Sequence, residues 1–172
     1  MISRPAPPRR SSRVTLRPLP LFEAFLEEHR TVVYRMLHAM VGPQAAEDCF
    51  QETFLSALRA YPRLGRDANL RAWVLRIATN KAFDHLRAAK RRAIPVADVP
   101  EQPVEGPELD GEPQLWQAVR GLPPLQRAAV VQRYVFDLPY AEVGALLGCS
   151  EEAARANAYE GRRKLRRAMT DA

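Results

Sequence analysis

Apolar residues recur at steps of three and four along most of this 172-residue chain, which is the spacing of one face of an α-helix. The first such segment begins at Leu21 and ends at Gly42, because glycine stops a helix and the proline after it starts the next. A second helix is predicted up to Pro62 and a third over residues 69–92. No segment alternates apolar and polar residues as a half-buried strand does, so the sequence predicts an all-α fold.

The second and third predicted helices are amphipathic. The apolar face of the second helix holds Ala46, Cys49, Phe50, Phe54, Ala57 and Leu58, and its polar face holds Glu47, Asp48, Gln51 and Glu52. The apolar stripe of the third helix holds Leu70, Trp73, Val74, Ile77 and Ala78. The C-terminal end of the third helix is basic, which suits the negative end of the helix dipole. Three such helices are expected to form one small domain.

The helical pattern stops at residues 93–113, where five prolines and six acidic residues occur without a basic one. Prolines at this spacing break helices and strands, and like charges repel, so we expect an extended linker. Beyond it the pattern predicts helices over residues 114–120 and 125–136, and then a helix pair over 140–167. The first twenty residues carry five arginines, five prolines and no acid, and are expected to be disordered.

The predicted fold is therefore two small helical domains joined by an acidic, proline-rich linker. The expected boundaries are a basic arm over 1–20, a domain over 21–92, the linker over 93–113 and a domain over 114–172. The net charge of +6 is modest, but basic residues gather at 87–92 and at 162–167. Two basic clusters separated by an acidic linker indicate a polyanion that is held in two places, although one such cluster alone is typical of a solvated helix end.

Several classes of protein are excluded by what the sequence lacks. No apolar run reaches the roughly 18 residues of a membrane span and the arm has no apolar signal core, so we expect a cytoplasmic protein without membrane insertion. Cys49 and Cys149 stand alone, which argues against a disulfide scaffold or a zinc module. The three histidines are isolated, and no glycine-rich phosphate loop occurs. We therefore expect no metal, cofactor, small-molecule substrate or catalytic activity.

The helix pair has the features of a DNA-reading helix-turn-helix. Tyr140 to Leu147 form a short first helix, Gly144 is small where two helices approach, and Gly148 stands where a turn needs a left-handed residue. Ser150 is a good N-cap for the second helix. The side chains expected opposite its buried stripe, able to reach bases and phosphates, are Arg155, Asn157, Tyr159, Arg162 and Arg163. The alternative is a helical hairpin that merely packs.

Two blocks of sequence resemble the extracytoplasmic-function class of bacterial RNA polymerase sigma factors. In the first domain, AEDCFQETF at 46–54 and RAWVLRIATN at 71–80 are similar to the family's AED-x-x-Q-E-x-F and R-x-W-L-x-x-I-A-x-N, and DHLR at 84–87 matches its basic end. In the second, LPPLQR at 122–127 and YAEVGALLGCS at 140–150 match LP-x-x-x-R and Y-x-E-I-A-x-x-L-G-x-S. The resemblance covers about residues 21–168, with both blocks in order across a linker.

The resemblance assigns roles that the residue chemistry supports. It implies that core RNA polymerase binds the polar face of the second helix at Asp48, Gln51 and Glu52, a patch suited to a positively charged partner. It implies that the third helix opens the minus-ten element of promoter DNA and captures an unstacked base. Asn80 offers such a base a donor and an acceptor. The other residues of the implied minus-ten site are Lys81, Asp84, Arg87 and Arg91. The apolar position of Trp73 favours a core role over base stacking.

The second helix of the helix-turn-helix would read the minus-thirty-five element, and here the sequence departs from the family pattern. Arg155 keeps a basic position, but Asn157 stands where an arginine is usual and is an adenine-type reader. Glu160 is acidic at a position where the family pattern has a basic residue. Its carboxylate either repels a DNA phosphate or accepts a hydrogen bond from the amino group of a cytosine. Together with Ser150, the residues expected opposite the buried stripe form the implied minus-thirty-five site.

The resemblance also implies that the linker threads through the polymerase, the alternative being a plain spacer. Members of the family are commonly held inactive by an anti-sigma partner. The competing functions are a stand-alone helix-turn-helix regulator, which leaves the third helix and the acidic linker without a role, and a core-binding decoy without promoter readout. Formation of a stoichiometric complex with core polymerase separates the regulator from the other two.

Overall fold

The computed structural model describes residues 19–92 and 113–170, and every regular element in these two ranges is a helix or a helical turn. The N-terminal part contains α1 (Phe22–Val41), α2 (Pro43–Ala60), the short turn η1 (Tyr61–Arg63) and α3 (Leu70–Arg92). The C-terminal part contains α4 (Pro113–Arg120), α5 (Pro124–Val130), the turn η2 (Val131–Val135), α6 (Tyr140–Leu147) and α7 (Glu151–Thr170). The predicted all-α fold with two helical domains is confirmed. The expectations for residues 1–18 of the arm and 93–112 of the linker lie outside the described residues.

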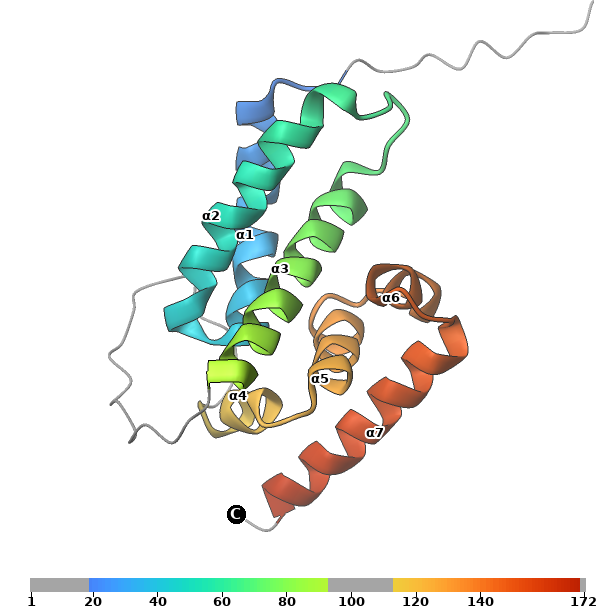
Figure 1. The fold of residues 1–172 in the computed structure, drawn as a ribbon. Coiled ribbons are helices and arrows are strands. Elements are labelled where there is room, and N and C mark those ends of the chain that lie inside the picture. The colour runs from blue at the N-terminus through green and yellow to red at the C-terminus, as the bar shows by residue number, and fades with distance from the viewer. Residues whose placement is uncertain (1–18, 93–112, 171–172) are drawn as a thin grey trace, which may run out of the picture.

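The N-terminal domain is a bundle of α1, α2 and α3, which pack against one another side by side (Figure 1). Gly42 separates the first two helices with a φ of 83°, a left-handed value that favours glycine, and Pro43 begins α2. Asn69 is the cap of α3, because its Oδ1 accepts a hydrogen bond of 3.0 Å from the Ala72 N–H. The predicted helix boundaries therefore agree with the structure within one or two residues.

Aromatic side chains fill one end of this bundle. Trp73 packs against the rings of Phe25 and Tyr61, with centroid separations of 5.7 Å and 6.1 Å, so its core role is confirmed. Leu58 was expected in the core, but half of its surface is exposed. The buried stripe of α2 ends at Ala57, and the next residue lies about 100° further around the helix, which turns Leu58 toward solvent.

The C-terminal domain departs from prediction in one segment. The continuous helix expected over residues 125–136 ends as α5 at Val130 and continues as the π-helical turn η2, in which the Phe136 N–H donates to the Val131 carbonyl at 3.3 Å. A π-turn holds an extra residue, and here Val131 and Gln132 are both buried. The break shifts the register of the side chains that follow, a change the apolar spacing alone did not indicate.

The turn between α6 and α7 confirms the expectation for both glycines. Gly148 adopts the left-handed conformation (φ 67°, ψ 33°) that ends α6. Gly144 approaches the next segment so closely that a Cβ there would lie 2.8 Å from the carbonyl oxygen of Cys149. The two helices are therefore joined by a tight turn that requires glycine for two different reasons.

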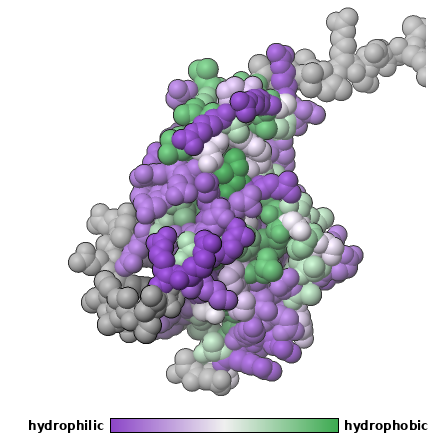
Figure 2. Space-filling view, in the orientation of Figure 1, coloured by the Kyte–Doolittle hydropathy of each residue, from purple (hydrophilic) through white to green (hydrophobic). Residues whose placement is uncertain are grey.

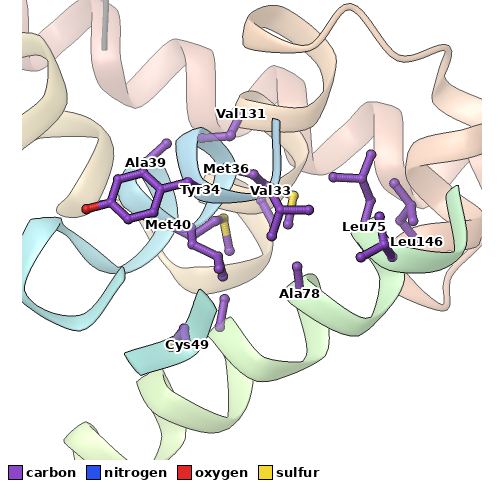
Figure 3. Packing of buried hydrophobic residues seen from close by; sticks show 14 of the residues in the cluster. Val33, Tyr34, Met36, Ala39, Met40, Cys49, Leu75, Ala78, Val131 and Leu146 are labelled. Atoms are coloured by element: carbon purple, nitrogen blue, oxygen red, sulfur yellow. The ribbon is translucent and has the colours of Figure 1, made fainter. Parts of the chain in front are cut away.

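The two domains share one hydrophobic core, which the sequence did not predict. The buried residues of both domains form a contiguous cluster, and Val131 and Leu146 lie beside residues of α1 and α3 (Figure 3). Gln132 Nε2 donates to Thr79 Oγ1 at 3.1 Å, and both side chains are almost completely buried. The C-terminal domain therefore docks on the N-terminal bundle by both apolar and polar contacts.

Neither described range contains a helix that is long and apolar enough to cross a membrane. Within the same ranges, no group of three or more His, Cys, Asp or Glu side chains is arranged to hold a metal ion. The surface in the orientation of Figure 1 is mostly hydrophilic, with smaller apolar areas (Figure 2).

Candidate nucleic-acid interface

Four of the five residues expected at the minus-ten site form one stripe along α3. Asn80, Asp84, Arg87 and Arg91 follow one another at steps of four, three and four, and all four are exposed. The Arg87 guanidinium is paired with the Asp84 carboxylate. The stripe thus presents an amide at its N-terminal end and guanidinium groups toward the basic C-terminal end of the helix.

The fifth residue, Lys81, lies beside the stripe and is engaged elsewhere. Its Nζ is 3.3 Å from Glu52 Oε2 on α2, so the ammonium group bridges two helices. Glu52 belongs to the expected polymerase-binding face, and the structure therefore joins one residue of each predicted site in a single ion pair.

The expected polymerase-binding face is a continuous exposed surface of α2. Asp48, Gln51 and Glu52 are exposed at helical spacing, and Gln51 Nε2 donates to Glu47 Oε1 at 3.1 Å. Leu55 and Leu58 continue the same face, each with about half of its surface exposed, and neither was predicted there. The helical spacing of the sequence indicates the position of Leu55, because Leu55 stands four residues after Gln51 and so lies on the same side of α2. The face thus combines acidic groups with two exposed leucines.

The N-terminal end of α7 is capped as the sequence predicts. Ser150 Oγ accepts a hydrogen bond of 3.1 Å from the Ala153 N–H. The pKa of the Glu152 carboxyl lies below its usual value, because its own backbone N–H and the Ser150 hydroxyl hydrogen-bond to the carboxylate. Glu152, Arg155 and Tyr159 share a shallow hollow on the outward side of this helix. This hollow lies in the N-terminal half of α7.

Arg155 is held in place by two neighbours. Its guanidinium is 2.8 Å from Glu151 Oε1 and lies over the ring of Tyr140, 5.2 Å from the centroid. Arg133 lies over the same ring at 5.3 Å. The sequence analysis had not assigned Arg133 and Tyr140 to the site, because no local spacing connects them to α7.

Asn157 and Glu160 lie differently from the outward side chains of α7. Asn157 is half-buried on the flank of the helix, where its Nδ2 donates to the Ala153 carbonyl at 2.9 Å. Glu160 pairs with Arg163 at 2.7 Å, so its charge is balanced on the same helix. Arg162 and Tyr159 are exposed, and the Arg162 guanidinium lies 5.8 Å from the centre of the Tyr134 ring. Four of the five expected side chains are therefore directed outward, and Asn157 is not.

Comparison with known proteins agrees with this division of the chain. The family model "Sigma-70 region 2" matches residues 25–92, and "Sigma-70, region 4" matches residues 113–165. The sigma factor CarQ of Myxococcus xanthus is 35% identical in sequence, over 84% of this chain and 87% of its own length. The ECF sigma factor SigE of Mycolicibacterium smegmatis is 32% identical over 86% of this chain, which spans only 61% of SigE.

A solved structure shows the same fold. The sigma factor RpoE of Bartonella quintana, crystallised with the anti-sigma factor NepR, superposes with a TM-score of 0.72, over 87% of this chain and 96% of that chain at 20% identity. The two matched regions, the identity to CarQ and the shared fold lead to one conclusion. The chain belongs to the extracytoplasmic-function class of RNA polymerase sigma factors.

Proposed function

We propose that this chain binds core RNA polymerase, recognises a two-part promoter with its two domains and opens the DNA near the start site. The observation that carries the proposal is the presence of two separate arginine-bearing surfaces in one chain, the stripe on α3 and the outward side of α7. A face of α2 suited to a protein partner lies next to the first of them. No other function we considered uses all three surfaces.

The stripe on α3 is suited to single-stranded DNA. Removing a base from the stack costs a few kcal/mol, which the captured base must repay in new contacts. The exposed Asn80 amide offers a donor and an acceptor to such a base, while Arg87 and Arg91 lie within three turns and can bind the flanking phosphates. Lys81 joins them if its ion pair with Glu52 opens.

The outward side of α7 is suited to the major groove at the minus-thirty-five element. We assign base contacts to Arg155 and Tyr159, because both line the exposed hollow near the start of the helix. Arg162, Arg163 and Ser150 at the helix N-terminus are proposed to bind phosphates. Arg133 is proposed as a further phosphate-binding residue, because it shares the ring of Tyr140 with Arg155. Asn157 reaches a base only by giving up its hydrogen bond to Ala153.

The proposed polymerase contact is the face of α2 that carries Asp48, Gln51 and Glu52, extended by Leu55 and Leu58. Acidic groups steer a basic partner into place, and the leucines supply apolar area that becomes buried. Sigma factors are generally non-enzymatic regulatory proteins, and we propose the same for this chain, acting in the cytoplasm. An anti-sigma partner that holds it inactive is also proposed from its family.

The test begins with purified chain and core bacterial RNA polymerase. We expect a one-to-one complex by size exclusion and promoter-dependent run-off transcripts from a library of promoters. A complex without transcripts would support a core-binding decoy, and the absence of any complex would support a stand-alone regulator. Asn80→Ala should reduce open-complex formation, detected by permanganate reactivity of unpaired thymines, more than it reduces polymerase binding. Equal loss of both would contradict the role in base capture.

A further inference from the structure

The C-terminal domain contains a cavity of about 430 Å³ to which the proposed function assigns no ligand. Its walls come from α4, the end of α5, the π-turn η2 and α7, and both α4 and α5 pack against α7 (Figure 1). Binding sites for small molecules in proteins generally have volumes between about 300 and 1,000 Å³. The cavity is therefore large enough to hold one small ligand.

Most of the cavity wall is apolar. The apolar residues from the three helices are Leu115, Trp116 and Val119 of α4, Val130 of α5 and Leu165 of α7. Apolar surface is stabilised when a ligand removes it from water. A small hydrophilic ion would leave most of this wall in contact with water, so the wall favours a ligand with an apolar body.

The π-turn η2 completes the wall with Val131, Tyr134 and Val135. A π-turn is rare in proteins and occurs frequently at functional sites. In this turn the Tyr134 and Val135 side chains remain 45% and 36% exposed. Their exposed apolar area adds to the surface that a ligand in the cavity would cover. The departure from regular helix in this domain therefore lies at the cavity.

The charged residues of the described lining are both arginines, Arg35 of α1 and Arg162 of α7. The Arg162 guanidinium lies 5.8 Å from the centre of the Tyr134 ring, which belongs to the same lining. Guanidinium groups bind carboxylates strongly, because two parallel N–H groups match the two oxygens. The lining thus complements a molecule that has an apolar body and one anionic group.

We propose that this cavity binds an amphipathic carboxylate, with its apolar body against α4 and η2 and its carboxylate on Arg162. A medium-chain fatty acid is the simplest molecule of this class. The effect of the ligand rests on the proposed promoter function, in which Arg162 binds a DNA phosphate, because a bound carboxylate competes for the same guanidinium. The site itself is a property of the free chain and is measured without polymerase or DNA.

Binding is measured in the full chain by NMR of the tryptophan indole N–H groups, with octanoate as the probe. The chain has two tryptophans and therefore two indole signals, which Trp116→Phe assigns. Trp116 lines the cavity, whereas Trp73 packs in the aromatic end of the N-terminal bundle. We expect octanoate, below the concentration at which it forms micelles, to shift the Trp116 signal saturably and to leave the Trp73 signal in place.

Two further probes separate the apolar body from the anionic group. Each buried methylene raises affinity about fourfold, so octanoate should bind about tenfold more tightly than hexanoate, which is two methylenes shorter. Octylammonium has the same apolar body with a positive charge, and should bind at least about tenfold more weakly than octanoate. Equal affinities for octanoate and octylammonium would overturn the proposal.

A variant that fills the cavity tests its location. Val135→Phe enlarges a partly exposed side chain of the lining and should weaken octanoate binding about tenfold or more. Leu125→Phe is the matched control, because Leu125 is 48% exposed and lies outside the described lining. Thermal unfolding shows that both variants remain folded. Equal affinities of Val135→Phe and Leu125→Phe for octanoate would overturn the proposal.

A second variant tests the carboxylate contact without changing the apolar wall. Arg162→Gln should bind octanoate about tenfold more weakly and should lose most of the preference for octanoate over octylammonium. Arg167→Gln makes the same change in charge at an exposed position of α7 outside the described lining, and should bind octanoate as the wild type does. An unchanged preference in Arg162→Gln would contradict the assigned contact.

Titration of the complex with core polymerase and promoter DNA measures the consequence. Octanoate should raise the apparent dissociation constant for promoter DNA with the wild-type chain but not with Val135→Phe. If no polymerase complex forms, the promoter function fails, while the NMR titration of the free chain still decides the ligand site. If octanoate leaves the Trp116 signal unchanged and core polymerase shifts it, the cavity is a docking site for protein and the proposal is wrong.

Discussion

The ammonium group of Lys81 lies 3.3 Å from the carboxylate of Glu52, so one ion pair joins the helix proposed to bind polymerase to the helix proposed to bind DNA. The Glu52 side chain is about two-thirds exposed, and pairs of this kind contribute between about 0 and 1 kcal/mol to stability. The pair is therefore a weak structural contact between two surfaces with separate roles.

Glu52→Gln should consequently change the free energy of unfolding by less than about 1 kcal/mol while weakening polymerase binding. The measurements are chemical denaturation and titration of core polymerase with labelled chain. Glu27→Gln removes the carboxylate of another exposed ion pair, with Arg30 on α1, and should leave polymerase affinity unchanged. A large loss of stability in Glu52→Gln would mean that the ion pair is structural.

Arg127 should be one of the most sensitive positions for stability. Arg127 is 8% exposed, and its guanidinium donates to the carbonyls of Met40, Arg120 and Leu122. The first two belong to the last turns of α1 and α4, where carbonyls have no partner within the helix. Burial lowers its pKa, yet the group stays charged at neutral pH. We expect Arg127→Met to lose about 2 to 4 kcal/mol of unfolding free energy. Arg166→Met at an exposed position of α7 should lose less than about 0.5 kcal/mol.

Arg155 and Tyr140 should act together in promoter binding. Arg155→Ala should weaken binding and leave the salt slope of the affinity nearly unchanged, because we assign Arg155 a base contact. A slope lowered by about one would show instead that the guanidinium contacts a phosphate. Tyr140→Phe keeps the ring under Arg155 and Arg133 and should bind nearly as wild type, whereas Tyr140→Leu should weaken binding. The measurement is fluorescence anisotropy of labelled promoter at several salt concentrations. Equal affinities for the phenylalanine and leucine variants would show that the ring does not position either arginine.

The two glycines of the turn should respond differently to alanine. At Gly144 a Cβ would lie 2.8 Å from a backbone oxygen that cannot move without shifting α7, so Gly144→Ala should lose about 1 to 3 kcal/mol. A Cβ at Gly148 would have no other part of the chain within 4 Å, so the cost of Gly148→Ala is the left-handed backbone alone, about 1 kcal/mol. Urea denaturation of both variants checks the order. A more stable Gly144→Ala than Gly148→Ala would contradict the close approach of α6 and Cys149.

Stability should fall as the pH is lowered through the range in which histidine titrates. Burial lowers the pKa of His29 and of His38, and the positive charges of Arg71 and Arg120 lower them further, against the opposing effect of Glu28 at His29. The unfolded chain then binds more protons than the folded chain below about pH 6.5, so stability is full above that pH and is lost as the pH falls toward the folded values.

The check is the slope of unfolding free energy against pH between 7.5 and 5.5. His38→Gln should reduce this slope, because the neutral amide takes up no proton. His85→Gln on the partly exposed surface of α3 serves as the comparison. An unchanged slope in His38→Gln would mean that protonation of His38 does not oppose folding. Since Arg120 lies in the C-terminal domain, the same titration should also weaken the contact between the two domains.

Local signals determined most of the secondary structure of this chain. Helix boundaries depend on caps and breakers next to the helix, and Gly42 and Ser150 act there as predicted. Asn69 caps α3 in the same local way. The turn of the helix-turn-helix was predictable for the same reason, because Gly144 and Gly148 satisfy requirements set within ten residues. The sequence motifs indicated the family that the comparisons confirmed.

Contacts between distant segments were decided only by the tertiary structure. The π-turn at Val131 to Val135 places Gln132 against Thr79, more than fifty residues earlier, and no periodicity within either helix indicates that pairing. Arg133 and Arg155 come from separate elements and both lie over the Tyr140 ring, which local spacing does not indicate either. Nor does the spacing show that the Asn157 side chain donates to the Ala153 carbonyl instead of pointing outward. Apolar spacing shows that a face is buried, but the partner that buries it depends on how the helices pack, and here that partner is the other domain.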